Sequence, residues 1–357
     1  MIAASAGAFD LKTPVKQAWE LSRKLVNAYE TLRRLGEIEV GASPRELVFA
    51  YDKINLYRYQ PEALVTCRAP VLIAYALVNR PYMLDLQPDR SFVRRLLQQG
   101  LDVYVIDWGY PTTADKYLSL DDYLNIFLND SVDFIRDTTK HDAINLMGIC
   151  QGGTFSTIYA ALYPQKIKNL VTIVAPVDFS TDDGLLFRWS KKMNVDAMVD
   201  HYGVIPGEVL SVGYLMLRPF MKISKYIDIL EVMDDRDKVE NFLRMEQWIL
   251  DSPAQAGECY RQFVKELYQK NKLVEGGLEI GEEKVDLKNI TMPLLNIYAS
   301  DDHIVPPNAS TPLNDLVGSA DKELYSFKGG HIGVFVSAKS QKELAPAIAR
   351  WLHQRAK

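Results

Sequence analysis

Short apolar runs alternate with helical patterns along much of the chain, and this alternation constrains the fold more than any other feature. Apolar residues recur at helical spacing over residues 121–139 and 154–163. Strands that alternate with helices are typical of a mostly parallel sheet with helices on its faces. The sequence therefore predicts an α/β fold. The expected strands cover residues 71–75, 103–106, 143–147, 170–175, 293–299 and 323–327.

The alternation stops between residues 175 and 293, a stretch far longer than the roughly dozen residues of a simple crossover. We therefore expect an insert between two core strands. Its apolar segment at residues 204–220 is expected to form the core of the insert, with a membrane or partner surface as the alternative. An insert of this kind is well placed to cap an active site. The expected division is a core at 70–178 and 290–357 with a cap subdomain at 179–289.

The first 69 residues are expected to form a helical and extended segment that precedes the core. Thr13 can cap a helix over residues 14–35, Pro14 suits its first turn, and Gly36 can end it. Leucines and a tyrosine recur on one face of this helix, as expected for a helix that packs against another element.

The composition favours an ordinary globular protein and argues against nucleic acid as a partner. The 357 residues are 48% hydrophobic and 24% charged, and the formal net charge of -5 comes without any basic block. We find no secretory signal, and no stretch reaches the roughly 18 apolar residues that cross a bilayer. Cys67, Cys150 and Cys259 are too few and too widely spaced for a disulfide framework. We therefore expect a cytoplasmic protein.

The stretch "LMGICQGGTF" at residues 146–155 has the pattern of a nucleophile elbow, with cysteine where serine is usual. In such an elbow the nucleophile occupies a sharp turn between a strand and a helix, and glycines flank it where a Cβ would clash. Gly148 and Gly152 take those positions around Cys150. An expected strand leads into the turn and an expected helix leaves it. The context therefore favours Cys150 as a catalytic nucleophile over an inert cysteine in a glycine-rich turn.

An elbow nucleophile needs an acid and a histidine, in the chain order nucleophile, acid, base. Asp301 and Asp302 follow the expected strand at 293–299, and His331 follows the one at 323–327. Both positions lie at strand ends, where open α/β sheets bind ligands. The choice between the two aspartates stays open at this point. His303 is a competitor for the base, but it adjoins the acid, so we expect it to support the site without reacting.

A thiol nucleophile indicates acyl transfer. A helix N-terminus and a nearby histidine can make a thiol reactive near neutral pH. Its attack on an acyl thioester gives another thioester of similar energy, so the acyl group stays activated for a second transfer. The oxyanion needs two backbone N–H donors, which we expect from Gln151 and from the loop after the strand at 71–75. Metal and phosphate-binding motifs such as C-x-x-C, H-E-x-x-H and G-x-x-x-x-G-K are missing, so no cofactor is expected.

Six segments distributed over nearly the whole chain give it a resemblance to a known family. They are "YALVNRPYMLDL", "DVYVIDWGYP", "GICQGG", "NFLRMEQWILDSPAQAGE", "DDHIVPP" and "GGHIG". Together they resemble the catalytic subunit of class III polyhydroxyalkanoate synthases, and Gln151 after the cysteine favours class III over class IV. The resemblance implies an α/β-hydrolase fold with a cap. It also implies that Cys150 is the nucleophile, Asp302 the acid and His331 the base.

The same resemblance implies the activity and the partners. The family polymerises (R)-3-hydroxyacyl-coenzyme A, chiefly the 3-hydroxybutyryl form, into polyester and releases coenzyme A. Its class III members work with a second subunit, are at least dimeric and associate with polyester granules in the cytoplasm. The His-Gly pair of many lipases is replaced here by Tyr75 and Ala76, and Val78 is the implied second oxyanion donor. Two alternatives stay open: a cysteine hydrolase of thioesters or lactones, and a non-catalytic granule protein.

Overall fold

The computed structural model describes residues 39–217 and 235–356, so the helix expected at 14–35 lies outside the described residues. The chain divides into two compact units. One consists of Val40–Leu217 and Trp248–Lys357, and the other of Met1–Glu39 and Arg218–Gln247. The first unit contains the whole sheet and every candidate catalytic residue. In the second, the described part is mainly the start of helix α9 (Arg236–Leu250), where Glu240 pairs with Arg236 and Arg244.

An eight-stranded sheet forms the centre of the first unit, in the order β1-β2-β6-β3-β7-β8-β13-β14. The six strands from β6 to β14 are parallel, whereas β1 and β2 pair antiparallel with their neighbours. The bounds are β1 Arg45–Tyr51, β2 Ile54–Tyr59, β3 Val71–Ala74, β6 Val103–Asp107, β7 Ile144–Ile149, β8 Ile167–Ile173, β13 Leu294–Ala299 and β14 Lys322–Phe327.

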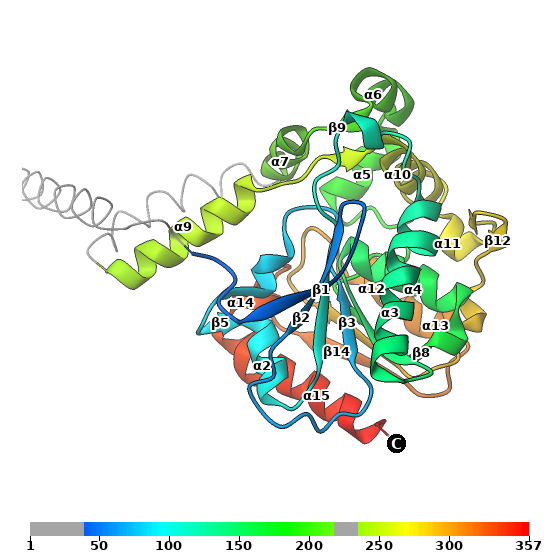
Figure 1. The fold of residues 1–357 in the computed structure, drawn as a ribbon. Coiled ribbons are helices and arrows are strands. Elements are labelled where there is room, and N and C mark those ends of the chain that lie inside the picture. The colour runs from blue at the N-terminus through cyan, green and yellow to red at the C-terminus, as the bar shows by residue number, and fades with distance from the viewer. Residues whose placement is uncertain (1–38, 218–234, 357) are drawn as a thin grey trace, which may run out of the picture. The chain divides into compact units, whose positions relative to one another are not determined.

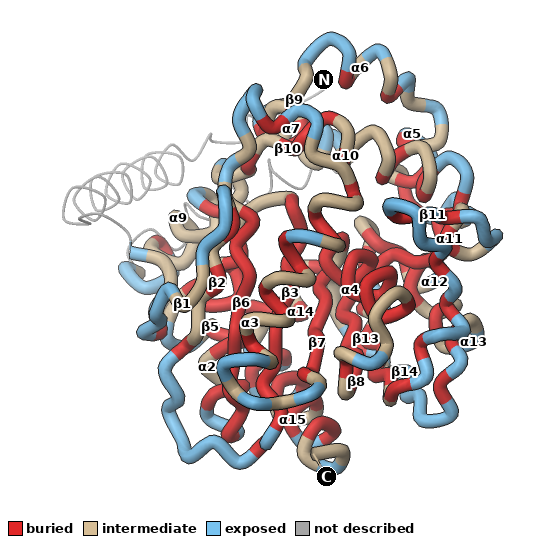
Figure 2. The backbone as a smooth tube through the Cα atoms, turned by 45° about the vertical axis from the view of Figure 1, so that its right-hand side comes forward, coloured by how far each residue is buried: buried red, intermediate tan, exposed pale blue. Residues whose placement is uncertain are grey.

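The six strands expected from the sequence are all present, with ends shifted by up to three residues. Every residue of β3, β6 and β7 is buried, because helices cover both faces of a parallel sheet. Figure 1 shows α2 (Phe92–Gln98) and α15 (Ala345–Gln354) on one side of the sheet, and α3 (Asn129–Thr139) and α4 (Gln151–Leu162) on the other. The buried backbone in Figure 2 is concentrated in these central strands and in α4.

β1 and β2 belong to the same sheet as the central strands, although both precede the expected core boundary at residue 70. These strands carry charged residues such as Arg45, Glu46 and Arg58, and β1 forms one edge of the sheet. An antiparallel edge strand keeps one face in water and tolerates charge. It therefore lacks the continuous apolar run by which the central strands were recognised.

An insert does interrupt the sheet between β8 and β13. Its described elements include α5 (Leu185–Lys192), α6 (Val195–Tyr202), β9 (Val204–Ile205), α7 (Gly207–Met216), α10 (Gly257–Gln262) and the π-helical η5 (Phe263–Gln269). Residues 179–217 and 248–289 belong to the same compact unit as the sheet, so this part of the expected cap is not a separate body. The described residues also form shorter elements: η1 Pro81–Leu84, β4 Asp85–Gln87, β5 Arg90–Ser91, η2 Thr113–Asp115, η3 Asp122–Leu128, η4 Pro164–Lys166, β10 Gln255–Ala256, α11 Lys272–Glu275, β11 Glu279–Ile280, β12 Glu283–Lys284, η6 Leu287–Asn289, α12 Pro307–Ser310, α13 Leu313–Leu316, α14 Gly333–Val336 and η7 Ser340–Leu344.

The apolar segment expected at 204–220 contributes to a small core of the insert. Ile205 and Leu210 pack with Val195, Val199 and Val264. Val212 and Met216 in α7 are exposed, so only one face of this helix is covered within the described residues. The segment's last three residues lie outside the description.

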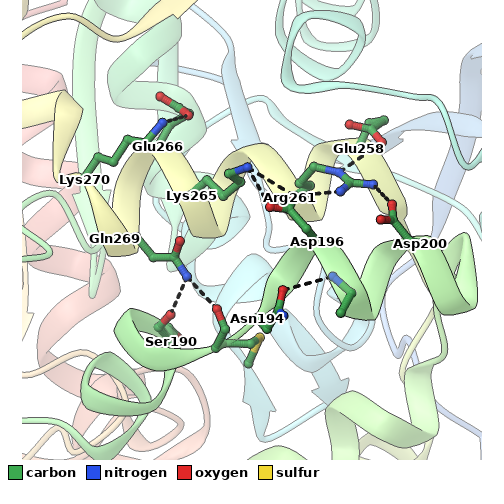
Figure 3. A network of polar contacts seen from close by, with 12 residues as sticks. Ser190, Asn194, Asp196, Asp200, Glu258, Arg261, Lys265, Glu266, Gln269 and Lys270 are labelled. Atoms are coloured by element: carbon green, nitrogen blue, oxygen red, sulfur yellow. Dashed lines mark hydrogen bonds and ion pairs between the residues drawn. The ribbon is translucent and has the colours of Figure 1, made fainter.

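Ion pairs on the surface of the insert join α6 to α10 and η5 (Figure 3). Arg261 contacts Asp196 and Asp200 at 2.7 Å each, and Lys265 contacts Asp196 at 2.8 Å. The side-chain amide of Gln269 donates hydrogen bonds to the backbone carbonyls of Ser190 and Met193. Because hydrogen bonds to Lys265 and Arg261 stabilise its charged form, the pKa of Asp196 is lowered. These exposed contacts supplement the small apolar core of the insert.

Candidate active site

Cys150 lies at the sharp turn between β7 and α4, as the elbow motif predicts. Its backbone has φ 54° and ψ -124°, a conformation that few non-glycine residues adopt. A Cβ on Gly152 would lie 2.2 Å from the carbonyl oxygen of Ala74, and one on Gly148 would lie 2.5 Å from the Cα of Gly153. Glycine is therefore required at both flanking positions, since α4 starts directly against the ends of β3 and β7.

Asp302 and His331 meet at the same edge of the sheet. His331 Nδ1 lies 2.6 Å from Asp302 Oδ2, and both side chains are buried. The other carboxylate oxygen, Oδ1, accepts the backbone N–H groups of Ile304 and Val305 at 2.9 Å each. Asp301 is exposed, and Ser300 donates to its carboxylate. The geometry thus selects Asp302 over Asp301 as the aspartate that contacts the histidine.

The electrostatics of His331 favour its protonated form. Burial alone would lower the pKa of His331, but the charges of Asp302 and Cys150, and hydrogen bonds to both, raise it to about 10. A positively charged imidazole beside a thiol is the setting in which a thiolate nucleophile is stabilised. His331 therefore contacts Asp302 directly and interacts electrostatically with Cys150.

Two backbone N–H groups are available next to Cys150. Among the described residues, neither Val78 nor Gln151 donates its backbone N–H to another group, and both residues line the same cavity as Cys150. The N–H of Leu77 is already used, because it donates to the side-chain oxygen Oε1 of Gln151 at 3.1 Å. The geometry is therefore compatible with the expected oxyanion donors, Gln151 at the helix start and Val78 in the loop after β3.

A cavity of about 220 Å³ opens above Cys150, between the sheet edge and the insert. Its walls are mostly apolar, and they include Trp189, Met193, Met198, Phe263, Ile304 and Val305. Tyr214, Tyr260 and Tyr268 also line it. Burial raises the pKa of all three phenols, that of Tyr260 to about 12, so they stay neutral at physiological pH. An apolar acyl chain fits such a lining.

The sequence interpretation missed these wall residues and several supporting contacts. Aromatic residues are frequent throughout the insert, so no local pattern distinguishes those that face the cavity. Gly153 is also required, because a Cβ there would lie 2.3 Å from the Cβ of Ala175. The double glycine of "GICQGG" was the signal that could have identified it.

The remaining candidate residues are His303 and the two other cysteines. His303 is half-buried next to Asp302, and its supporting role stays a prediction. Cys67 and Cys259 are buried free thiols, and burial raises the pKa of each. Across residues 39–217 and 235–356, no group of three or more His, Cys, Asp or Glu side chains could hold a metal ion. None of the helices described there is long and apolar enough to span a membrane.

A histidine–aspartate pair beside a nucleophile elbow is the arrangement of α/β-hydrolase-fold enzymes. A family model described as alpha/beta hydrolase fold matches residues 69–338. The structure also resembles the monoacylglycerol lipase of Paleococcus ferrophilus with a TM-score of 0.52, covering 84% of this chain and 99% of the lipase. At 18% identity this likeness concerns the fold alone. The α/β-hydrolase fold expected from the resemblance is confirmed.

More specific matches define the family. A model described as poly-beta-hydroxybutyrate polymerase (PhaC) N-terminus matches residues 20–96. The poly(3-hydroxyalkanoate) polymerase subunit PhaC of Allochromatium vinosum is 51% identical, covering 94% of this chain and 96% of the relative. The PhaC subunit of Thiocystis violacea is 50% identical over 96% of this chain and 98% of its own length. The chain belongs to the PhaC family of poly(3-hydroxyalkanoate) polymerases, which confirms the resemblance found in the sequence.

Proposed function

We propose that the chain polymerises (R)-3-hydroxyacyl-coenzyme A, chiefly 3-hydroxybutyryl-coenzyme A, into polyester through a covalent thioester on Cys150. The observation that carries this proposal is the buried contact of His331 with Asp302 beside Cys150, whose side chain lines an apolar cavity. The family relationship supplies the class of reaction, and the site supplies the groups that such a reaction needs. The substrate carries its own activated acyl group, so no cofactor is required.

Acylation begins with the thiolate of Cys150 and the protonated imidazole of His331. The sulfur attacks the thioester carbonyl, and the N–H groups of Val78 and Gln151 stabilise the oxyanion. The bond from carbon to the sulfur of coenzyme A then breaks. His331 gives its proton to the departing thiolate, so the products are free coenzyme A, a neutral histidine and an acyl group on Cys150.

Elongation uses the neutral histidine as a base. The 3-hydroxyl of one acyl group attacks the thioester carbonyl of the other, and His331 accepts the hydroxyl proton. When the hydroxyl attacks the thioester on Cys150, an ester forms and the Cys150 thiolate leaves. The thiolate–imidazolium pair of Cys150 and His331 is then restored. Asp302 orients His331 in this scheme, because both of its oxygens are engaged, one by the imidazole and one by two backbone amides.

The same proposal extends to the assembly. The active species is at least a homodimer that works with a second class III subunit, and it acts in the cytoplasm at the surface of polyester granules. The family relationship supports this assembly. The net charge of -5, without a basic block, argues against nucleic acid as a partner.

Thiol release from (R)-3-hydroxybutyryl-coenzyme A tests the proposal, with and without a class III partner subunit. The wild type is expected to release thiol and form insoluble polyester, whereas Cys150→Ala is expected to do neither. Cys67→Ala is the matched control, since that thiol is buried and its variant should retain activity. Release of free 3-hydroxybutyrate alone would make the protein a hydrolase. A fully active Cys150→Ala would refute the nucleophile.

A further inference from the structure

The loop after β3 is held from two sides by side chains that the reaction scheme does not use. On one side, Gln151 Oε1 accepts the N–H of Leu77 at 3.1 Å. On the other, Asn79 Nδ2 donates to the carbonyl oxygens of Trp248 at 3.0 Å and Ile249 at 3.3 Å. The residue between the two anchors is Val78.

The anchor at Asn79 holds an unfavourable backbone conformation. Its φ is +57°, in the left-handed region that non-glycine residues rarely occupy. A second hydrogen bond joins the same two segments, because the indole N–H of Trp248 donates to the carbonyl of Arg80 at 2.9 Å. Arg80 in turn forms an ion pair with Asp107 at the end of β6.

The anchor at Gln151 determines which amide of the loop remains for substrate. Because its side chain occupies the N–H of Leu77, that group cannot donate to an oxyanion. Among the described residues the next N–H, that of Val78, has no acceptor, and Val78 lines the cavity with Cys150. Gln151 therefore contributes in two ways: its backbone N–H lies at the start of α4, and its side chain fixes the opposite donor.

We propose that the side chains of Gln151 and Asn79 are positioning residues that together aim the Val78 N–H at the oxyanion. The proposal rests on the nucleophilic role of Cys150 proposed above. An oxyanion donor must lie within a few tenths of an ångström of hydrogen-bond distance from the oxyanion. Donors aligned before the reaction stabilise the transition state far more than mobile donors do. A displacement of about 1 Å can cost about 100-fold in rate.

Two substitutions remove one anchor each and leave every reacting group in place. Gln151→Met keeps the backbone N–H and the side-chain length but loses the acceptor for Leu77. Asn79→Gly loses the bonds to Trp248 and Ile249, and glycine tolerates the positive φ. Gln341→Met is the matched control, a buried glutamine that donates to the carbonyl of Phe335 in α14 and not to the loop after β3.

Two reactions of the Cys150 sulfur distinguish a misplaced oxyanion donor from general disruption of the site. Acylation by (R)-3-hydroxybutyryl-coenzyme A passes through an oxyanion, whereas alkylation by iodoacetamide displaces iodide and forms none. We expect Gln151→Met and Asn79→Gly each to lower the acylation kcat about 10- to 100-fold with little change in KM. The alkylation rate of Cys150 should stay within about twofold of the wild type. Gln341→Met should change neither rate.

The outcomes distinguish this proposal from the proposed function. If acylation and alkylation fall together, the anchors support the elbow as a whole, and the positioning role is refuted. Unchanged acylation in both variants would refute it as well. If instead Cys150→Ala still releases thiol at the wild-type rate, the nucleophile itself is wrongly assigned. In the double variant we expect a loss smaller than the product of the two single losses, because both side chains hold one loop.

Discussion

The elbow and the wall of the cavity lie next to each other, but they are constructed in different ways. At the elbow, backbone approaches backbone so closely that Gly148 and Gly152 leave no room for a methyl group. In the wall, no described residue outside Gly213's own stretch of α7 has an atom within 4 Å of the place where a Cβ on Gly213 would lie. The proposed nucleophile is thus held in a tight turn, whereas the proposed acyl-binding wall has room for a larger side chain at Gly213.

The largest expected effect concerns the base. His331→Gln keeps a polar side chain but removes the proton acceptor, and general acid–base groups contribute about 10²- to 10⁴-fold in rate. We expect thiol release to fall by that factor. His353→Gln is the control, since His353 contacts the carbonyl of Gln99 in another part of the unit. A His331→Gln variant with more than a tenth of the wild-type rate would contradict the assignment.

Alanine substitutions at Gly152 and Gly213 test whether the elbow and the wall differ in the space around their backbones. Gly152→Ala forces a methyl group onto the carbonyl oxygens of Ala74 and Tyr75, and overpacking of this kind costs about 1–3 kcal/mol or more. Gly213 lies in the interior of α7, where alanine is favoured over glycine by about 0.5–1 kcal/mol, and Gly213→Ala meets no other element of the described part of the chain. Chemical denaturation should therefore show opposite signs. Equal destabilisation of both variants would remove the distinction between the two regions.

The buried pair should make stability depend on pH in a defined direction. The pKa of His331 is raised from 6.5 to about 10, so its stabilisation is complete below about pH 6.5 and is lost as the pH rises through about 10. Asp302→Asn removes the charge that raises it. The free energy of unfolding of Asp302→Asn should be lower than that of the wild type by about 1.5–3 kcal/mol near pH 6. The two values should approach each other toward pH 10. A difference that grows with pH would contradict this sign.

The smallest effect is expected on the surface of the insert. Arg261→Met breaks the pairs with Asp196 and Asp200, which are exposed and therefore screened by salt. Thermal unfolding at low salt should show a slight loss of stability that vanishes at high salt. A loss that persists at high salt would indicate that α6 depends on this network more than its exposure suggests.

The sequence predicted the parts of this molecule that obey local rules. A strand, a glycine-flanked cysteine and a helix identify an elbow because no other residues fit the turn. His331 was recognisable because it follows a strand, and chain order narrowed the acid to two adjacent aspartates. Choosing Asp302 required either the resemblance or the structure, since both aspartates end the same strand.

The parts that the sequence did not reveal depend on residues far apart in the chain. The wall brings Tyr214 next to Tyr268, and the loop anchor brings Asn79 next to Trp248. No local pattern encodes such contacts. The edge strand β1 was missed for another reason: its charged residues face water, so it resembles a surface segment in composition.

The proposed thioester on Cys150 is tested most directly by detecting the acyl group itself. The protein is incubated briefly with (R)-3-hydroxybutyryl-coenzyme A, quenched in acid and digested, and its peptides are analysed by mass spectrometry. We expect a 3-hydroxybutyryl group on the peptide that carries Cys150, absent from Cys150→Ala and accumulating less in Gln151→Met. Acylation of a different residue, or turnover without any acyl-enzyme under conditions that trap one, would contradict it.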